Sequence, residues 1–358
     1  MVQCKVHDNE NATGRSPPLK LITFTVPCYN SAAYMDKCIQ SLLPAGEEAE
    51  IILVDDGSTD DTPAIADRYA AAYPGVIRAV HQQNGGHGSG VNQGIRKANG
   101  LYFKVVDSDD WLDGDALAAL MEHLRRFARM DDPIDLVLCN YVYEHVEDNT
   151  QRVVRYRNTL PVDQIFAWAD VGHFNATQFL TMHSTVYRTE VLRQAGISLP
   201  LHTFYVDNIF VYQPLPSVHS LYYIDVDLYR YFIGRADQSV TEENLMRRID
   251  QQILVTKLMA DAHDLEALEQ DNRRLAAYMY HYLSIMLMIC TIYLMLSGTE
   301  ENLKKSDELW AWLKEVHPAT FRRMRYRSAN VAFLLPGKAG RDIDIFFYKL
   351  LRKIYKFN

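Results

Sequence analysis

Two aspartates at alternate positions, Asp107 and Asp109, follow an apolar stretch that predicts a β-strand at residues 102–106. Side chains at i and i+2 of a strand point to the same face, so both carboxylates can reach one cation beyond the strand end. Oxygen ligands suit Mg²⁺ or Mn²⁺, which usually complete their coordination with phosphate and water. The same residues allow a plainer interpretation, in which Asp109 or Asp110 caps the helix expected near residues 111–117.

A second acidic pair, Asp55 and Asp56, ends another apolar run at residues 51–54. A carboxylate can accept the N3–H of uracil, whereas cytosine carries no proton at that position. One such aspartate therefore suffices to select uridine nucleotides. The alternative is a turn followed by a helix cap, because Asp, Gly and Ser favour tight turns.

The elements that must position these acids alternate between strand and helix patterns. Strands are expected at residues 21–26, 51–54, 76–81 and 102–106, with a helix pattern after each of the first three. This alternation predicts an α/β fold with a mostly parallel sheet and helices on both faces. Ligands of such sheets bind beyond the carboxyl ends of the strands, where both acidic pairs are expected.

Four segments then resemble a known family, in this order: TVPCYNSAAYMDKCIQSLL, IILVDDGSTDDT, QQNGGHGSGVNQGI and GLYFKVVDSDDWLD. They are similar to the nucleotide-sugar half of family 2 glycosyltransferases with the GT-A (Rossmann-like) fold, a likeness that weakens towards residue 241. We therefore expect a leader at 1–19, a GT-A domain at 20–240 and a helical region at 241–358. The GT-A domain divides into a nucleotide-sugar half (20–115) and an acceptor half (116–240).

The resemblance implies a UDP-sugar donor and assigns roles to individual residues. Pro27, Tyr29 and Asn30 line the uridine, and Asp56 accepts the uracil N3–H. Asn84 follows in the glycine-rich segment as a polar group that lines the site.

For the diphosphate, the resemblance implies a site built by Asp107, Ser108 and Asp109. Asp107 contacts the ribose or a metal-bound water, and Asp109 ligates Mn²⁺ or Mg²⁺. The cation stabilises the negative charge that develops on the departing UDP.

The family inverts the anomeric centre in one displacement, which requires a base near the acceptor hydroxyl. The segment FYVDNIFVY nominates Asp207, although Val206 stands where many relatives carry Glu, and a structural carboxylate remains the alternative. His183 lies where relatives often carry a histidine near the diphosphate, and a structural histidine is equally consistent. His87 could donate to phosphate or simply occupy a turn, while Asp110 could join the site or cap a helix.

Two departures from the family pattern affect mechanism. Gly90 and Val91 stand where many relatives have Ala-Arg, so Lys104 or an arginine elsewhere is expected to replace a phosphate-facing cation. The Q-x-x-R-W signature of processive synthases is absent, which favours transfer of one hexosyl unit per encounter. Gln238–Thr241, followed by Arg247 and Arg248, is a different arrangement that could close over the diphosphate.

Charge is distributed unevenly along the chain. The net charge is −8, yet residues 309–358 contain eleven Lys or Arg and three acidic residues, a net +8 that leaves −16 for the rest. The acidic body argues against a nucleic-acid partner. In the tail 343–358, basic and apolar residues alternate in a way typical of a helix on an anionic membrane surface, or of an amphipathic helix packed on its own domain.

Residues 276–296 contain no Asp, Glu, Lys or Arg and are long enough to span a membrane. Their histidine and tyrosines favour a buried helix or a contact in a homo-oligomer over a transmembrane segment. The five scattered cysteines fit free thiols in a reducing cytoplasm. The expected location is the cytoplasm, peripheral to the inner face of the cell membrane.

These observations predict a metal-dependent, inverting glycosyltransferase that moves a sugar from a UDP-sugar to a glycan or lipid-linked acceptor. The product would be a bacterial surface polysaccharide, a glycolipid or a wall polymer. A degenerate GT-A protein acting as a binding partner is the alternative, but Asp107, Asp109 and Asp207 are all present. A nucleotidyltransferase would show a glycine-rich loop with a basic residue after the first strand, and VPCYNSAAY has neither.

Overall fold

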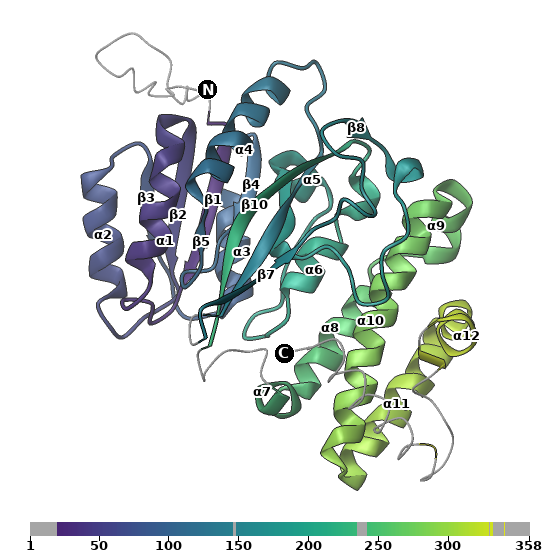
Figure 1. Ribbon diagram of the computed structural model, residues 1–358. Helices are drawn as coiled ribbons and strands as arrows, with labels where there is room; N and C mark the ends of the chain where they lie inside the picture. Colours follow the sequence, from purple (N-terminus) through teal and green to yellow (C-terminus); the bar gives the residue numbers. More distant parts are fainter. Residues whose placement is uncertain (1–19, 146–147, 235–241, 329, 332–339, 341–358) are drawn as a thin grey trace, which may run out of the picture.

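A ten-stranded sheet runs through the protein, with helices on both sides (Figure 1). The computed structural model describes residues 20–145, 148–234, 242–328, 330–331 and 340. The strands are β1 (Ile22–Cys28), β2 (Ala49–Asp55), β3 (Ile77–His81), β4 (Tyr102–Val105), β5 (Trp111–Leu112), β6 (Leu136–His145), β7 (Thr150–Val154), β8 (Ile165–Phe166), β9 (Thr185–Arg188) and β10 (Leu221–Ile233).

The helices flank the sheet and continue beyond it. They are α1 (Met35–Leu42), α2 (Thr62–Ala72), α3 (His87–Lys97), α4 (Gly114–Phe127), α5 (Thr189–Gln194), α6 (Asp207–Tyr212), α7 (Glu242–Arg247), α8 (Ile249–Asp261), α9 (Leu265–Asp271), α10 (Arg273–Ser297), α11 (Glu300–Val316) and α12 (Pro318–Arg327). Short 3₁₀ helices are η1 (Leu43–Glu48), η2 (Trp168–Asp170), η3 (Met182–Ser184) and η4 (Leu215–Ser217).

The first half of the sheet is parallel, in the order β3-β2-β1-β4. Every residue of β1 and β2 is buried, as expected when helices cover both faces of a parallel sheet. The α/β prediction from the alternating pattern is therefore confirmed. The carboxyl ends of these parallel strands lie at one edge of the sheet, where β2 and β4 are followed by acidic residues.

The second half of the sheet is mixed. Strand β9 runs antiparallel to both β4 and β6, and β10 runs parallel to β6. The long strand β10 pairs with β6 along most of its length, with an irregular register around Asp227. Strand β4 pairs with β1 and β9, and β5 pairs with β10 at Leu112 and Tyr229. Both ends of the loop between β4 and β5 are therefore fixed in the sheet.

Helix α3 lies close against β1 because it has glycines on the contact face. A Cβ at Gly94 would stand 2.2 Å from Thr25 Oγ1, and one at Gly90 would stand 2.9 Å from the Cβ of Pro27. This close approach requires the small residue at position 90. It also places His87, the first residue of α3, beside the loop that follows β4.

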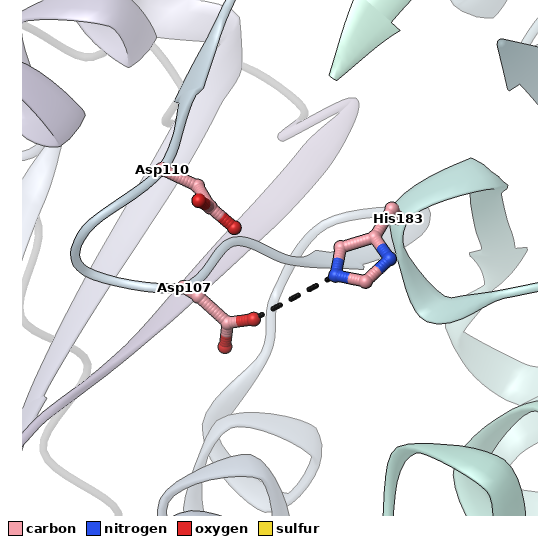
Figure 2. Close-up of side chains that lie close together, drawn as sticks. All are labelled: Asp107, Asp110 and His183. Carbon is pink, nitrogen blue, oxygen red and sulfur yellow. Dashed lines mark ion pairs between the residues drawn. The ribbon is translucent and has the colours of Figure 1, made fainter. Parts of the chain in front are cut away.

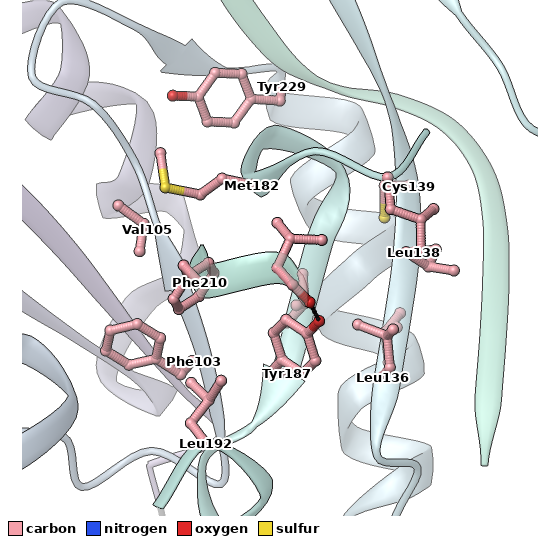
Figure 3. Close-up of a cluster of buried hydrophobic side chains, with 14 of the residues drawn as sticks. Phe103, Val105, Leu136, Leu138, Cys139, Met182, Tyr187, Leu192, Phe210 and Tyr229 are labelled. Carbon is pink, nitrogen blue, oxygen red and sulfur yellow. Dashed lines mark hydrogen bonds between the residues drawn. The ribbon is translucent and has the colours of Figure 1, made fainter. Parts of the chain in front are cut away.

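A core cluster fills the space between β4, β6, β9 and α6 (Figure 3). Phe103 contacts Phe210, and Tyr187 meets Phe210 edge-on at a centroid distance of 5.7 Å. The Tyr187 hydroxyl donates a hydrogen bond of 2.7 Å to the carbonyl of Val211, so the buried phenol is satisfied. Tyr229 lies at the margin of this cluster.

Helix α10 is the one helix of the described residues that is long and apolar enough to cross a membrane, and 78% of its most apolar window is buried inside the protein. Its Tyr278 stacks on Trp168 and accepts a hydrogen bond of 2.9 Å from the Leu180 amide. Its Tyr282 donates to Asn208 Oδ1 at 3.1 Å, so the helix supports the start of α6. The buried-helix interpretation is confirmed. The leader 1–19, the segment 238–241 and the tail 343–358 lie outside the described residues, and the domain division stays a prediction.

Candidate active site

The loop after β4 carries Asp107, whose carboxylate faces a histidine from α3. His87 Nε2 donates to Asp107 Oδ1 at 2.8 Å. Burial lowers the pKa of His87, but the hydrogen bond and the charge of Asp107 outweigh burial and raise it. Burial conversely raises the pKa of Asp107, but His87, together with the charges of His183 and Lys104, outweighs burial and lowers it. The structure therefore places His87 in the first turn of α3, hydrogen-bonded to Asp107, and its predicted role as a phosphate donor stays a prediction.

His183 lies in η3, and its ring faces the second carboxylate oxygen of Asp107 (Figure 2). Its Nε2 lies 3.9 Å from Asp107 Oδ2, and its ring stacks on Tyr231 at 4.5 Å and meets Tyr229 edge-on at 4.8 Å. Burial lowers the pKa of His183 to about 4, so the imidazole is neutral at pH 7. Its Nδ1 is buried and has no hydrogen-bond partner among the described residues.

Asp107, Asp110 and His183 form a group in which one ligand atom of each residue lies within 4.8 Å of the others (Figure 2). The donor set fits a divalent cation because it combines two carboxylates with a neutral imidazole. Burial and the charges of Asp109 and Asp107 raise the pKa of Asp110, a sign of crowded negative charge that a cation would relieve. Asp109 lies outside this group, so its predicted role as a metal ligand stays a prediction.

Asp110 is not a helix cap, and neither is Asp109. Helix α4 begins at Gly114, and its cap is Asp113, which accepts a hydrogen bond of 3.1 Å from the Ala116 amide. Asp110 is 1% exposed and instead accepts hydrogen bonds from β10. The helix-cap hypothesis is wrong because β5 intervenes, which shifts the helix start by several residues.

Asp207 is the first residue of α6 and lies within electrostatic reach of both Asp107 and His87. Burial raises the pKa of Asp207 to about 6; the charge of His87 lowers it and that of Asp107 raises it. Tyr205, two residues earlier, has φ 66°, a left-handed conformation that is strained for a bulky side chain. Such strain concentrates at functional sites.

Two arginines reach the same segment from the α7–α8 junction. The Arg248 guanidinium lies 3.5 Å from the centre of the Phe204 ring, and the Phe204 amide donates to Gln251 at 2.8 Å. The charges of Arg248 and Arg247 both act on Tyr205. These arginines therefore lie near the segment that leads into Asp207.

Asp56 directly follows β2 and is 3% exposed. Its carboxylate accepts hydrogen bonds from the glycine-rich turn. Its Oδ1 accepts from Gln82 Nε2 at 2.6 Å and from the Gly85 amide at 2.9 Å, and its Oδ2 accepts from the Gly86 amide at 2.7 Å. Because a carboxylate oxygen has two lone pairs, one acceptor position remains on Oδ2. Asn84 Nδ2 donates to the backbone carbonyl of Asp56 at 2.8 Å, so Asn84 stabilises this turn.

The remaining predicted nucleotide residues gather near the ends of β1 and β4. Pro27 lies beneath Gly90, Tyr29 is 55% exposed, and the Ser108 and Ser31 hydroxyls are 2.7 Å apart. Asn30 has φ 50°, and its Oδ1 accepts from the Thr59 amide at 2.9 Å. The structure thus brings the β1 segment next to the loop after β4.

Lys104 does not replace the missing phosphate-facing arginine. Its Nζ donates to the His183 carbonyl at 2.7 Å and to the Thr185 carbonyl at 3.3 Å, and the residue is fully buried. Burial lowers the pKa of Lys104 to about 8. The ammonium group therefore anchors the segment that carries His183, and the prediction for Lys104 is wrong because β4 turns this side chain into the interior.

The tyrosines around His183 were not predicted from the sequence as part of the site. Tyr141 and Tyr143 alternate on β6, and Tyr229 and Tyr231 alternate on β10. The i, i+2 spacing on a strand places each pair on one face, a signal that could have predicted an aromatic wall. The parallel pairing of β6 with β10 brings the two pairs together beside His183.

Comparison with known proteins agrees with this geometry. Residues 23–193 match the model of the family described as Glycosyl transferase family 2. The chain is 28% identical over 219 residues to EpsH of Bacillus subtilis, whose name marks it as a glycosyltransferase; the match covers 59% of this chain and 60% of EpsH. The chain thus spans less than two thirds of that relative.

Solved structures share the fold. The chain resembles residues 1–349 of TarS from S. aureus in complex with UDP-GlcNAc, with a TM-score of 0.64, 18% identity, and coverage of 94% of this chain and 91% of that one. It also resembles the mannosyltransferase PcManGT from Pyrobaculum calidifontis in complex with GDP-Man and Mn²⁺, with a TM-score of 0.50, 17% identity, and coverage of 92% and 87%. The fold is that of a GT-A glycosyltransferase, as expected. Residues 23–193 are therefore similar to a glycosyl transferase family 2 domain.

Proposed function

We propose that this protein is a family 2 glycosyltransferase that moves a sugar from a UDP-sugar to an acceptor hydroxyl, with inversion and with Mn²⁺ or Mg²⁺. The observation that carries the proposal is the convergence of Asp207, Asp107, Asp110 and His183. Asp56, directly after β2, follows another strand of the same sheet. TarS in complex with UDP-GlcNAc has a similar fold, and PcManGT in complex with Mn²⁺ supports a cation.

On the donor side, Asp56 offers its remaining acceptor position to uracil, and the β1 end, with Pro27, Tyr29 and Asn30, lines the base. Asp107, Asp110 and His183 would hold the divalent cation, with Asp109 as a further ligand. When bound, the cation neutralises charge on the diphosphate and stabilises the departing UDP. Arg247 and Arg248 are the cations that we propose in place of the missing arginine.

On the acceptor side, Asp207 acts as the general base. Its carboxylate takes the proton from the acceptor hydroxyl while that oxygen bonds to the anomeric carbon, and the bond from that carbon to UDP breaks on the opposite face. A base works best when its pKa lies near the operating pH, and a pKa of about 6 meets this condition.

The acceptor that we propose is a glycan or a lipid-linked glycan, used in the synthesis of a surface polysaccharide, glycolipid or wall polymer. Transfer is non-processive and occurs in the cytoplasm at the inner face of the cell membrane. The basic residues of the tail 343–358 support a peripheral contact with anionic lipid.

A thermal-shift screen tests the donor and cation choices together. A ligand at a hundred times its dissociation constant adds about 2.7 kcal/mol to the free energy of unfolding. UDP-sugars should raise Tm only with Mn²⁺ or Mg²⁺, and GDP-mannose should not. A shift with GDP-mannose alone would contradict the uridine assignment, and an equal shift in EDTA would contradict the metal.

A further inference from the structure

The Tyr229 hydroxyl joins both ends of the acidic loop. It donates to Asp110 Oδ2 at 2.6 Å and accepts from the Asp107 amide at 3.1 Å. The loop is itself closed by a hydrogen bond of 3.0 Å from the Asp110 amide to the Asp107 carbonyl. One phenol on β10 therefore fixes the backbone of one candidate ligand and the carboxylate of another.

The ring of Tyr229 is as constrained as its hydroxyl. Tyr229 is fully buried, meets the His183 ring edge-on at 4.8 Å, and lies 5.1 Å from Lys104 Nζ, which in turn holds the His183 carbonyl. Tyr229 thus contacts all three members of the Asp107–Asp110–His183 group. The Phe232 amide, three residues along β10, donates to the other oxygen of Asp110 at 2.8 Å.

We infer that Tyr229 is a positioning residue that sets the affinity of the acidic loop for the divalent cation. The inference rests on the proposed use of that cation. A carboxylate pair binds a cation tightly only when its oxygens are already oriented, and hydrogen bonds to the ligands from outside the coordination sphere provide this orientation. Without the hydroxyl, Asp110 loses one fixed partner and the Asp107 amide loses its acceptor.

The experiment titrates Mn²⁺ into the full-length protein with UDP present and follows free Mn²⁺ by electron paramagnetic resonance. Tyr229→Phe keeps the ring and removes the hydroxyl, and should weaken Mn²⁺ binding by about 10–100-fold, the usual effect of removing such a partner. Tyr231→Phe is the matched control, because its ring stacks on His183 but its hydroxyl makes no hydrogen bond within the described part of the chain. It should bind Mn²⁺ like wild type. Turnover in Tyr229→Phe should recover as Mn²⁺ is raised.

The outcomes separate the two claims. If wild type takes up no Mn²⁺, the proposed metal dependence fails. If wild type binds Mn²⁺ and Tyr229→Phe binds it equally well, or if both phenylalanine variants lose it equally, the role of Tyr229 is overturned. Should Tyr229→Phe not fold, amide hydrogen exchange of the wild type decides. The Asp107 amide should exchange slowly because Tyr229 accepts its hydrogen bond, and fast exchange would refute the contact.

Discussion

At the scale of single residues, we predict that catalytic activity depends on the ionisation of Asp207, because burial raises its pKa from 3.8 to about 6. Only the ionised carboxylate can accept a proton, so kcat/KM should fall as the pH drops through about 6. A profile of UDP release between pH 4.5 and 8 checks this. An acid limb near 4 or a flat profile would contradict Asp207 as the base.

The raised pKa of Asp207 also makes the free energy of unfolding depend on pH. The raised pKa favours the neutral carboxyl in the folded state, so this contribution is full below pH 3.8 and is lost as the pH rises through about 6. At pH 8 the folded protein therefore carries an unfavourable buried charge. This cost is typical of a residue kept for chemistry.

Asp109 carries the clearest test of the cation among single residues. Asp109→Ala should abolish the Mn²⁺-dependent part of UDP binding in calorimetry while Tm stays within a few degrees of wild type. The reason is that Asp109 belongs to the acidic loop and its charge acts on Asp110. If the Mn²⁺-dependent heat of UDP binding were unchanged, Asp109 would not be a metal ligand. Asp107, Asp110 and His183 would then be the proposed ligands.

At the scale of single elements, the contact of α3 with β1 positions His87. Gly94→Ala should destabilise the fold by about 1–3 kcal/mol, the cost of overpacking, because the new methyl group would stand 2.2 Å from Thr25 Oγ1. Urea unfolding measures this change. Gly114→Ala is the control: its Cβ would meet nothing within 4 Å, and it should be neutral or stabilising by about 0.4–1 kcal/mol. Equal stability of the two variants would contradict the close packing.

The sequence was informative where the pattern is local. The strands that end near Asp56 and Asp107 could be predicted because buried parallel strands are short apolar runs that end in polar residues. The role of Asp110 could not, since it depends on β5 pairing with β10, more than a hundred residues away in the chain. The inward direction of Lys104 and the wall of tyrosines around His183 likewise arise from long-range pairing.

At the scale of the whole molecule, the charge asymmetry bears on where the protein acts. Deleting residues 343–358 should reduce sedimentation with anionic liposomes while UDP-sugar hydrolysis continues. Each cation near an anionic surface contributes about 1 kcal/mol to binding, and the apolar residues of the tail add buried area. Full-length protein that ignores such liposomes at low salt would contradict a membrane role, and so would a truncation that unfolds.

The central claim is that an ionised Asp207 and a divalent cation act together on a UDP-sugar. The most direct measurement is UDP release from UDP-sugars, with Mn²⁺ or with EDTA, by wild type and Asp207→Asn. We predict release with Mn²⁺, none in EDTA, and a kcat about 10²–10⁴-fold lower in Asp207→Asn, the usual contribution of a positioned base. Release that persists in EDTA, or that Asp207→Asn leaves unchanged, would contradict the account.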